Sequence, residues 1–394
     1  IFVDLIGTPI SNDYLTKEKL NFSENYYPLK LFVNESNWLV QIDEFKSAHK
    51  IFGEEYIYYS SFSSSWLKHA ENYVDMIVKR LKLNKNSIVA EIAANDGYLL
   101  QYFAKYKIPS YGIEPATGPA KVAKEKGVDI VEEYFGKDLA RVLSVDRKAD
   151  LIIGNNVFAH VPQINDFVSG LKILLNLKGV ITLEFPHLME LVENNQFDTI
   201  YHEHFYYFSL TAVNAVMNKH ELKIFDVERI QTHGGSLRIF IEHNNGPWTV
   251  KNNVINVLKD EENHGMKTLD YYTGFQGKIN KIKNEYMLFM LKEKSIGKSI
   301  IGYGAAAKGN TFLNYCGIKQ DLIDYVVDAS PYKQNMYLPG SHIPIMSESE
   351  ILKTKPDYIL ILPWNIKDEI SNQLSYIRDW GGKFIVAIPS IDIF

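Results

Sequence analysis

The chain has 394 residues, of which 46% are hydrophobic and 23% charged, proportions typical of a folded globular protein. A chain of this length usually forms more than one hydrophobic core, so several domains are expected. The 42 Lys and Arg residues against 47 Asp and Glu give a formal net charge of −5. No excess positive charge is left to neutralise a nucleic-acid backbone, which argues against a nucleic-acid partner.

The sequence predicts a cytoplasmic protein that is not anchored in a membrane. No apolar run reaches a membrane span's length of about 18 residues. The segment Ile1–Gly7 lacks the basic start and long apolar core of a signal peptide. The single cysteine, Cys316, can form neither an internal disulfide nor a Cys-rich metal site.

Residues 1–75 are rich in tyrosine and polar turn residues and predict an irregular N-terminal cap. Residues 76–247 differ, because short apolar runs alternate there with helical patterns. This alternation predicts a doubly wound domain with a mostly parallel sheet. Its strands are predicted at 87–92, 111–114, 149–154 and 179–184, with an antiparallel edge hairpin at 222–227 and 236–242.

Residues 248–296 mix Lys, Glu and apolar residues, which predicts long amphipathic helices acting as a bridge. A second α/β unit is predicted over 297–394, with a Rossmann-like alternation of strands and helices. Its strands are predicted at 299–304, 325–328, 357–362 and 383–388. The expected fold class is therefore α/β, with two doubly wound domains and a small N-terminal cap.

A cofactor site is predicted at the carboxyl ends of the central strands, where ligands bind in open α/β sheets. The small residues of the turn Glu91–Gly97 allow backbone amides to approach a ligand. Glu114 ends the second strand, where an acid commonly binds a ribose diol. The predicted cofactor-binding residues are Glu91, Ala93, Asn95, Asp96, Gly97, Glu114, Pro115, Asn155, Asn156 and Val157.

Taken singly, these residues also fit a tight turn and a surface carboxylate, but their order on successive strand ends favours a site. The turn is not G-x-G-x-x-G, which argues against a dinucleotide dehydrogenase here.

The most unusual stretch is Tyr201-His202-Glu203-His204, which is surrounded by aromatic residues. Histidine titrates near neutrality, a neighbouring Glu can orient it, and a Tyr can hydrogen-bond an oxyanion. A metal site is disfavoured, because no third ligand is evident and the H-E-x-x-H spacing is absent. The alternative is histidines packed in an aromatic core. Structural or surface roles are expected for His187, His233, His243 and His342.

These residues resemble those of the sugar C-methyltransferase family that acts on dTDP-linked 4-keto deoxysugars. The resemblance covers nearly the whole chain, and the run Tyr201–Phe205 is its most specific part. The other stretches that carry it are 7–12, 56–61, 91–97, 234–238, 302–309, 339–345 and 363–365.

The resemblance implies a zinc-binding N-terminal module, a central class I methyltransferase domain that binds S-adenosylmethionine (SAM), and a C-terminal Rossmann-like domain. It implies a nucleotide-sugar substrate and a monomeric protein. It also implies that a base removes the proton beside the 4-keto group and that the resulting enolate takes the methyl group. The implied catalytic residues are His204 as the base, Tyr201, Glu203, His160 and one tyrosine of the pair Tyr56 and Tyr58.

Substrate-binding residues are expected at His202, Arg238, Tyr303 and Lys308. Lys308 follows Gly302-x-Gly304, so a helix N-terminus with a counter-charge for phosphate is one interpretation. A packing turn common to Rossmann-like domains is the other.

The N-terminus departs from the family pattern, because Asn34 and Asn37 stand where cysteines are expected and no earlier Cys pair is present. Neutral amides are poor zinc ligands. We therefore predict that zinc is absent and that aromatic packing holds the cap.

Three other functions fit parts of the sequence. A sugar O- or N-methyltransferase would use the same base. A catalytically silent nucleotide-sugar binding protein would explain the missing zinc ligands. A NAD-dependent sugar oxidoreductase would use the C-terminal unit, but that unit shows neither a third glycine nor an evident acid partner.

Overall fold

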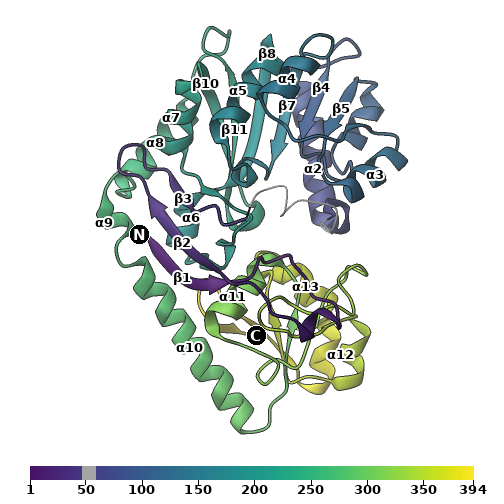
Figure 1. Ribbon diagram of the computed structural model, residues 1–394, viewed down its shortest axis with the longest axis vertical. Helices are drawn as coiled ribbons and strands as arrows, with labels where there is room; N and C mark the ends of the chain where they lie inside the picture. Colours follow the sequence, from purple (N-terminus) through teal and green to yellow (C-terminus); the bar gives the residue numbers. More distant parts are fainter. Residues whose placement is uncertain (47–58) are drawn as a thin grey trace.

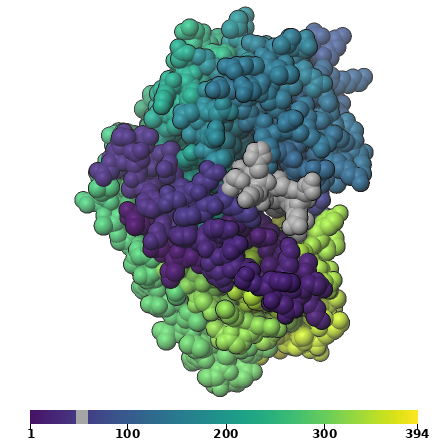
Figure 2. All heavy atoms as spheres, in the orientation of Figure 1, coloured from purple at the N-terminus to yellow at the C-terminus, as the bar shows by residue number. Residues whose placement is uncertain are grey.

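The computed structural model describes residues 1–46 and 59–394, which form three β-sheets (Figure 1). The seven-stranded second sheet lies at the top of Figure 1 and the six-stranded third sheet at the bottom. The N-terminal strands lie between them on the side of the long helix α10 (Phe275–Ser295). Figure 2 shows the N-terminal residues, in purple, spread across the junction of the two larger bodies.

The first sheet is antiparallel and has the order β1-β2-β3-β9. Its strands are β1 (Val3–Thr8), β2 (Tyr27–Val33), β3 (Val40–Ile42) and β9 (Tyr206–Tyr207). The prediction that this region is irregular is wrong for β1, β2 and β3. These strands are completed by β9, which comes from a segment more than 160 residues away in the chain, so no local pattern announces the pairing.

The second sheet has the order β10-β11-β8-β7-β4-β5-β6. The parallel strands are β4 (Val89–Ile92), β5 (Ser110–Ile113), β6 (Asp129–Val131), β7 (Ala149–Asn155) and β8 (Leu175–Pro186). The predicted edge hairpin is confirmed as β10 (Leu222–Ile230) paired antiparallel with β11 (Ser236–His243). The strand order reverses at β4, which puts the ends of β4, β5 and β7 at one place.

Helices cover both faces of this sheet (Figure 1). They are α2 (Ser64–Leu81), α3 (Thr117–Glu125), α4 (Lys137–Leu143), α5 (Ile164–Leu174) and α7 (Leu210–Lys219). The short helix α6 (Leu188–Glu193) packs instead in the core shared with the N-terminal and C-terminal parts.

The predicted boundary between residues 75 and 76 falls inside α2. The Ser63 hydroxyl caps α2 by accepting a hydrogen bond from the backbone of Trp66. The buried face of α2, with Tyr73 and Ile77, packs in the core of the second sheet.

The third sheet has the order β14-β13-β12-β15-β16-β17, parallel except for β17. Its strands are β12 (Ile300–Tyr303), β13 (Val326–Val327), β14 (Ile345–Met346), β15 (Tyr358–Ile361), β16 (Lys383–Val386) and β17 (Asp392–Ile393). Its helices are α11 (Ala307–Cys316), α12 (Ser349–Thr354) and α13 (Lys367–Gln373). The predicted second α/β unit is therefore present.

The helical segment between the two larger sheets consists of α8 (Asn252–Asn263), α9 (Leu269–Tyr272) and α10. Val254 and Val257 of α8 pack in the core of the second sheet. Ile282 and Tyr286 of α10 pack instead with the third sheet. The segment thus ties both bodies together, and none of the described helices combines the length and apolarity that crossing a bilayer requires.

Candidate active site

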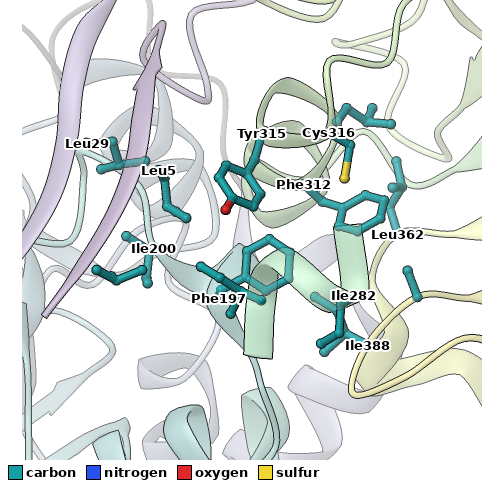
Figure 3. Close-up of a cluster of buried hydrophobic side chains, with 14 of the residues drawn as sticks. Leu5, Leu29, Phe197, Ile200, Ile282, Phe312, Tyr315, Cys316, Leu362 and Ile388 are labelled. Carbon is teal, nitrogen blue, oxygen red and sulfur yellow. The ribbon is translucent and has the colours of Figure 1, made fainter. Parts of the chain in front are cut away.

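The histidine-rich segment is anchored in a core that all three parts of the chain share (Figure 3). Phe197 and Ile200 are fully buried just before Tyr201. Phe197 contacts the rings of Phe312 and Tyr315 on α11. Because α11, the N-terminal sheet and α10 meet around these side chains, the residues that follow them are held rigidly at the junction of the domains.

His204 forms hydrogen bonds through both ring nitrogens. Its Nδ1 lies 3.0 Å from the carbonyl oxygen of Thr199, and its Nε2 lies 2.9 Å from the hydroxyl of Tyr201. A carbonyl oxygen only accepts, so Nδ1 carries the proton and Nε2 of the neutral ring accepts from Tyr201. Burial, with the ionisable groups of His160, His233 and Lys308 nearby, holds the pKa of His204 well below its usual range. The imidazole therefore carries a lone pair at neutral pH.

His160 ends the short 3-10 helix that follows β7, and its ring centroid lies 4.7 Å from that of His204. Burial lowers the pKa of His160 to about 4. The structure thus brings together two neutral imidazoles that are 44 positions apart in the sequence.

Glu203 is buried on the side of the N-terminal unit. Its Oε1 accepts hydrogen bonds from the backbone and the carboxamide of Asn12, both at 3.1 Å. Its Oε2 is buried without a hydrogen-bond partner among the described residues. Burial raises the pKa of this carboxyl to about 7, so it exchanges a proton near neutrality.

One predicted substrate-binding residue, His202, does not join this group. The predicted catalytic pair Tyr56 and Tyr58 lies outside the described residues. His202 is 3% exposed and turns toward the N-terminal sheet, where its Nε2 bonds the carbonyl oxygen of Pro28 and its ring contacts Tyr27. These contacts give His202 a packing role in this structure, and a contact with substrate stays a prediction.

The predicted cofactor-binding residues gather at the carboxyl ends of β4, β5 and β7. The turn after β4 has left-handed backbone at Ala93, Asn95 and Gly97. A Cβ atom on Gly97 would come within 2.9 Å of Val128, so the turn requires glycine there. That the backbone amides of this turn approach a ligand stays a prediction.

Three buried acids surround this turn. Glu91 is fully buried, and burial, with Glu114 and Asp96 nearby, holds its pKa well above the usual range. The carboxylate of Glu114 accepts hydrogen bonds from the backbone of Asn95 and Ala116, both at 2.9 Å. Burial nonetheless raises the pKa of Glu114 to about 7. Asp96 forms an ion pair with Lys126.

The end of β7 completes this group. Asn155 is 7% exposed, and neither atom of its carboxamide has a hydrogen-bond partner among the described residues. Buried polar groups almost always have a hydrogen-bond partner, so a bound polar ligand is the expected partner of these atoms. Pro115 and Val157 lie half-buried beside the acids and the amides. Three acids for hydroxyl and amino groups, with an open buried amide, fit the polar groups of SAM.

Lys308, at the start of α11, lies near the imidazoles. Its Nζ donates to Asn365 Oδ1 at 2.7 Å and lies 4.7 Å from the ring centre of Trp364. The Trp364 indole donates to Asp198 Oδ2 at 2.7 Å. Burial lowers the pKa of Lys308, and its charge in turn lowers the pKa of His204. A cation from the C-terminal domain therefore faces the histidine-rich segment.

The other two predicted substrate-binding residues are engaged within the protein. Arg238 forms ion pairs with Glu184 and Glu228 and is 7% exposed. The Tyr303 hydroxyl donates to Glu348. Their side chains serve internal networks in this structure, and a contact with substrate stays a prediction.

Sequence reasoning missed two features of the site. His233, expected to be structural, bonds Asn156 and lies near Lys308. An acid does follow the second strand of the C-terminal unit, contrary to expectation: Asp328 accepts from the backbone of Ala305 and of Ser330. The two following glycines were the signal for His233, because they mark a tight turn.

Parts of the chain match known protein families. Family models match residues 1–52 as a putative zinc binding domain, 66–227 as a methyltransferase domain and 231–389 as a C-methyltransferase C-terminal domain. C-methyltransferase NovU of Streptomyces niveus is 32% identical over 384 residues, which cover 97% of this chain and 91% of that protein.

Two solved structures resemble part of the chain. The PH0226 protein of Pyrococcus horikoshii OT3 has 14% identity and a TM-score of 0.38, and the match covers 50% of this chain and 99% of that chain. An S-adenosylmethionine-dependent methyltransferase of Clostridium acetobutylicum ATCC 824 has 12% identity and a TM-score of 0.37, covering 46% and 92%.

The fold and the cofactor side of the site define an S-adenosylmethionine-dependent methyltransferase. More narrowly, the chain belongs to the C-methyltransferase family that includes NovU.

The N-terminal unit does not fit the metal that its family model implies. The chain's single cysteine is Cys316, outside this unit. Asn34 Oδ1 accepts from the backbone of Ser36, and Asn37 Oδ1 accepts from that of Leu39, so both amides stabilise the turn between β2 and β3. Within residues 1–46 and 59–394, no cluster of three or more His, Cys, Asp or Glu could bind a metal ion.

Proposed function

We propose that this methyltransferase transfers the methyl group of SAM to carbon, at C3 of a dTDP-linked 4-keto deoxysugar. The observation that carries the proposal is the contact between Tyr201 and His204 beside His160, because it places a neutral base in a desolvated site. A carbon nucleophile next to a ketone needs such a base, since the proton on that carbon must be removed first. The sequence resemblance supports the sugar and its nucleotide.

In this proposal, the Tyr201 hydroxyl turns from Nε2 of His204 to the ketone oxygen, and the freed lone pair of Nε2 receives the proton of the carbon beside the ketone. The electron pair left behind moves onto the ketone oxygen and forms an enolate. Lys308 then supplies a positive charge for that oxygen or for the diphosphate. When bound, SAM would supply a methyl group on a positively charged sulfur; the enolate carbon would take this group as the carbon–sulfur bond breaks, with neutral S-adenosylhomocysteine as the leaving group. The protonated His204 afterwards returns its proton to solvent.

Desolvation makes the unprotonated imidazole the resting form, and negative charge nearby favours its protonated form. The enolate provides that charge during the reaction. Glu203, with its pKa raised to about 7 by burial, is a second group near His204 that can carry negative charge. The site therefore favours proton transfer only while an anion forms, which suits a carbon acid.

The test is proton exchange without methyl transfer. We expect the protein in deuterated water, given a dTDP-4-keto-6-deoxysugar and no SAM, to exchange the proton beside the ketone for deuterium, measured by NMR. His204→Asn should slow this exchange at least about 100-fold. Tyr206→Phe is the matched control, because Tyr206 bonds Pro162 in the same segment and should exchange at the normal rate.

If His204→Asn exchanged this proton at the full rate, His204 would not be the base. No exchange by the unsubstituted protein, despite SAM binding, would favour a sugar O- or N-methyltransferase instead.

A further inference from the structure

The turn at residues 232–235, here called the His233 turn, has a strained backbone. His233 has φ of +55°, and the two glycines after it have φ of +89° and +114°. A histidine in the left-handed region is uncommon, and such strain persists only where the surroundings impose it. The turn joins β10 to β11 at the end of the sheet where the candidate site lies.

The surroundings do impose it. A Cβ atom on Gly234 would come within 2.4 Å of the Trp364 ring, and one on Gly235 within 2.6 Å of Glu190. The Gln196 side chain donates to the carbonyl oxygen of Gly234 at 2.7 Å. The turn is therefore held between α6 and a tryptophan of the C-terminal domain, and this packing fixes where His233 points.

His233 points at the cofactor side of the site. Its Nε2 lies 2.9 Å from the carboxamide nitrogen of Asn156, and its ring lies edge-on to Trp66 at 5.1 Å. Asn156 has left-handed backbone as well, with φ of +53°, and its backbone N–H donates to the carbonyl oxygen of Glu184. Two strained residues on separate loops thus meet through one side-chain hydrogen bond.

This bond decides which atom of Asn156 remains available. With its nitrogen engaged by His233, the carboxamide oxygen is buried and has no hydrogen-bond partner among the described residues. Both carboxamide atoms of the neighbouring Asn155 are also buried without a hydrogen-bond partner among the described residues. Three adjacent buried polar atoms without partners are costly unless a ligand satisfies them.

We propose that His233 is a positioning residue for the methyl donor, which holds the Asn156 carboxamide so that its oxygen faces SAM. His233 does not itself touch the cofactor in this scheme. The strain of the turn, which Trp364 and Gln196 maintain, keeps the histidine in place when the cofactor leaves. A histidine that only fills space beside Trp66 would need no particular rotation of Asn156.

The test measures binding of SAM and of S-adenosylhomocysteine by calorimetry, without any substrate. The first variant is His233→Asn, because asparagine tolerates left-handed backbone but is too short to reach Asn156. We expect a Kd about three- to tenfold higher for both ligands, the value of one hydrogen bond. Asn156→Ala should weaken binding at least as much. His243→Ala, at the other end of β11, is the matched control and should bind normally.

The double variant His233→Asn/Asn156→Ala separates positioning from packing. If His233 acts through Asn156, the double variant binds SAM no more weakly than Asn156→Ala alone. In steady-state assays, His233→Asn should then raise KM for SAM while KM for the sugar stays unchanged. Thermal unfolding shows that each variant is folded. An unchanged Kd in folded His233→Asn, or losses that multiply in the double variant, would overturn the proposal.

Discussion

At the scale of single residues, burial sets the protonation of the site. It lowers the pKa of His160 to about 4 and raises that of Glu114 and Glu203 to about 7. A carboxyl whose pKa is raised on folding stabilises the free protein below its unfolded value near 4.5, and this contribution is lost as the pH rises through about 7. A ligand that binds the ionised carboxylates stabilises the folded protein above pH 7 and offsets this loss of stability.

SAM affinity should therefore depend on pH. We expect Glu114 to accept hydrogen bonds from the cofactor's ribose as a carboxylate, so Kd should be about tenfold higher at pH 6 than at pH 8. Calorimetric titration at several pH values measures this. Glu114→Gln, which cannot ionise, should bind more weakly and give a much flatter profile. A flat profile for the unsubstituted protein would contradict the assigned role of Glu114.

Much of the candidate cofactor site could be predicted because its residues follow strands in a regular order. Glu91, Glu114 and Asn155 stand at the ends of β4, β5 and β7, and a parallel sheet brings such ends together. The two glycines after His233 signal a tight turn, but the role of the histidine could not be predicted, because a lone histidine gives no periodic signal. The place of the turn depends on packing of Gly234 against Trp364, from a distant part of the chain.

At the scale of elements, α8 is fastened to the methyltransferase domain by one buried carboxylate. Glu261 accepts hydrogen bonds from the backbone of Leu210 and Thr211 at the start of α7, and its Oε1 lies 2.8 Å from Nε2 of His187. Burial acts to raise its pKa, but the bonds from His187 and Thr211 outweigh burial and the pKa lies below its ordinary value. The carboxylate thus caps α7 and fixes α8 upon it.

Glu261→Ala should lower the free energy of unfolding by about 3 kcal/mol, because it leaves His187 and two helix amides buried without a partner. Denaturant titration measures the change. The matched control is Glu262→Ala, whose side chain is 63% exposed and pairs only with Lys267, and it should change stability by less than about 0.5 kcal/mol. Equal effects of the two substitutions would contradict the fastening role.

Alternation of strands and helices predicted the second and third sheets, because each βαβ unit is local in sequence. The first sheet escaped prediction, because β3 pairs with β9, which follows the histidine-rich segment. Pairing between strands that lie far apart in the sequence depends on the tertiary fold. It also joins the N-terminal unit directly to the residues around His204.

At the scale of the whole molecule, aromatic contacts hold the N-terminal unit to the helical segment. Trp38 stacks on Tyr272 with ring centroids 6.3 Å apart, and Phe2 contacts both Tyr272 and Phe275. A further bond, from the Tyr14 hydroxyl to the carbonyl oxygen of Ala305, reaches the C-terminal domain. These contacts hold the N-terminal unit in place and require no metal ion.

We therefore expect stability that does not depend on zinc. Treatment with a strong chelator should leave the melting temperature unchanged, because Asn34 and Asn37 close the turn where the family has thiolates. Elemental analysis of the purified protein provides the second measurement. One tightly bound zinc per chain, with a lower melting temperature after its removal, would contradict this expectation.

The central claim, methyl transfer to carbon, is tested most directly by the structure of the product. The protein is incubated with a dTDP-4-keto-6-deoxysugar and SAM labelled with carbon-13 in its methyl group, and the sugar is examined by NMR. Our account predicts that the labelled methyl carbon is bonded to the ring carbon beside the ketone. A labelled methyl group on oxygen or nitrogen would contradict it.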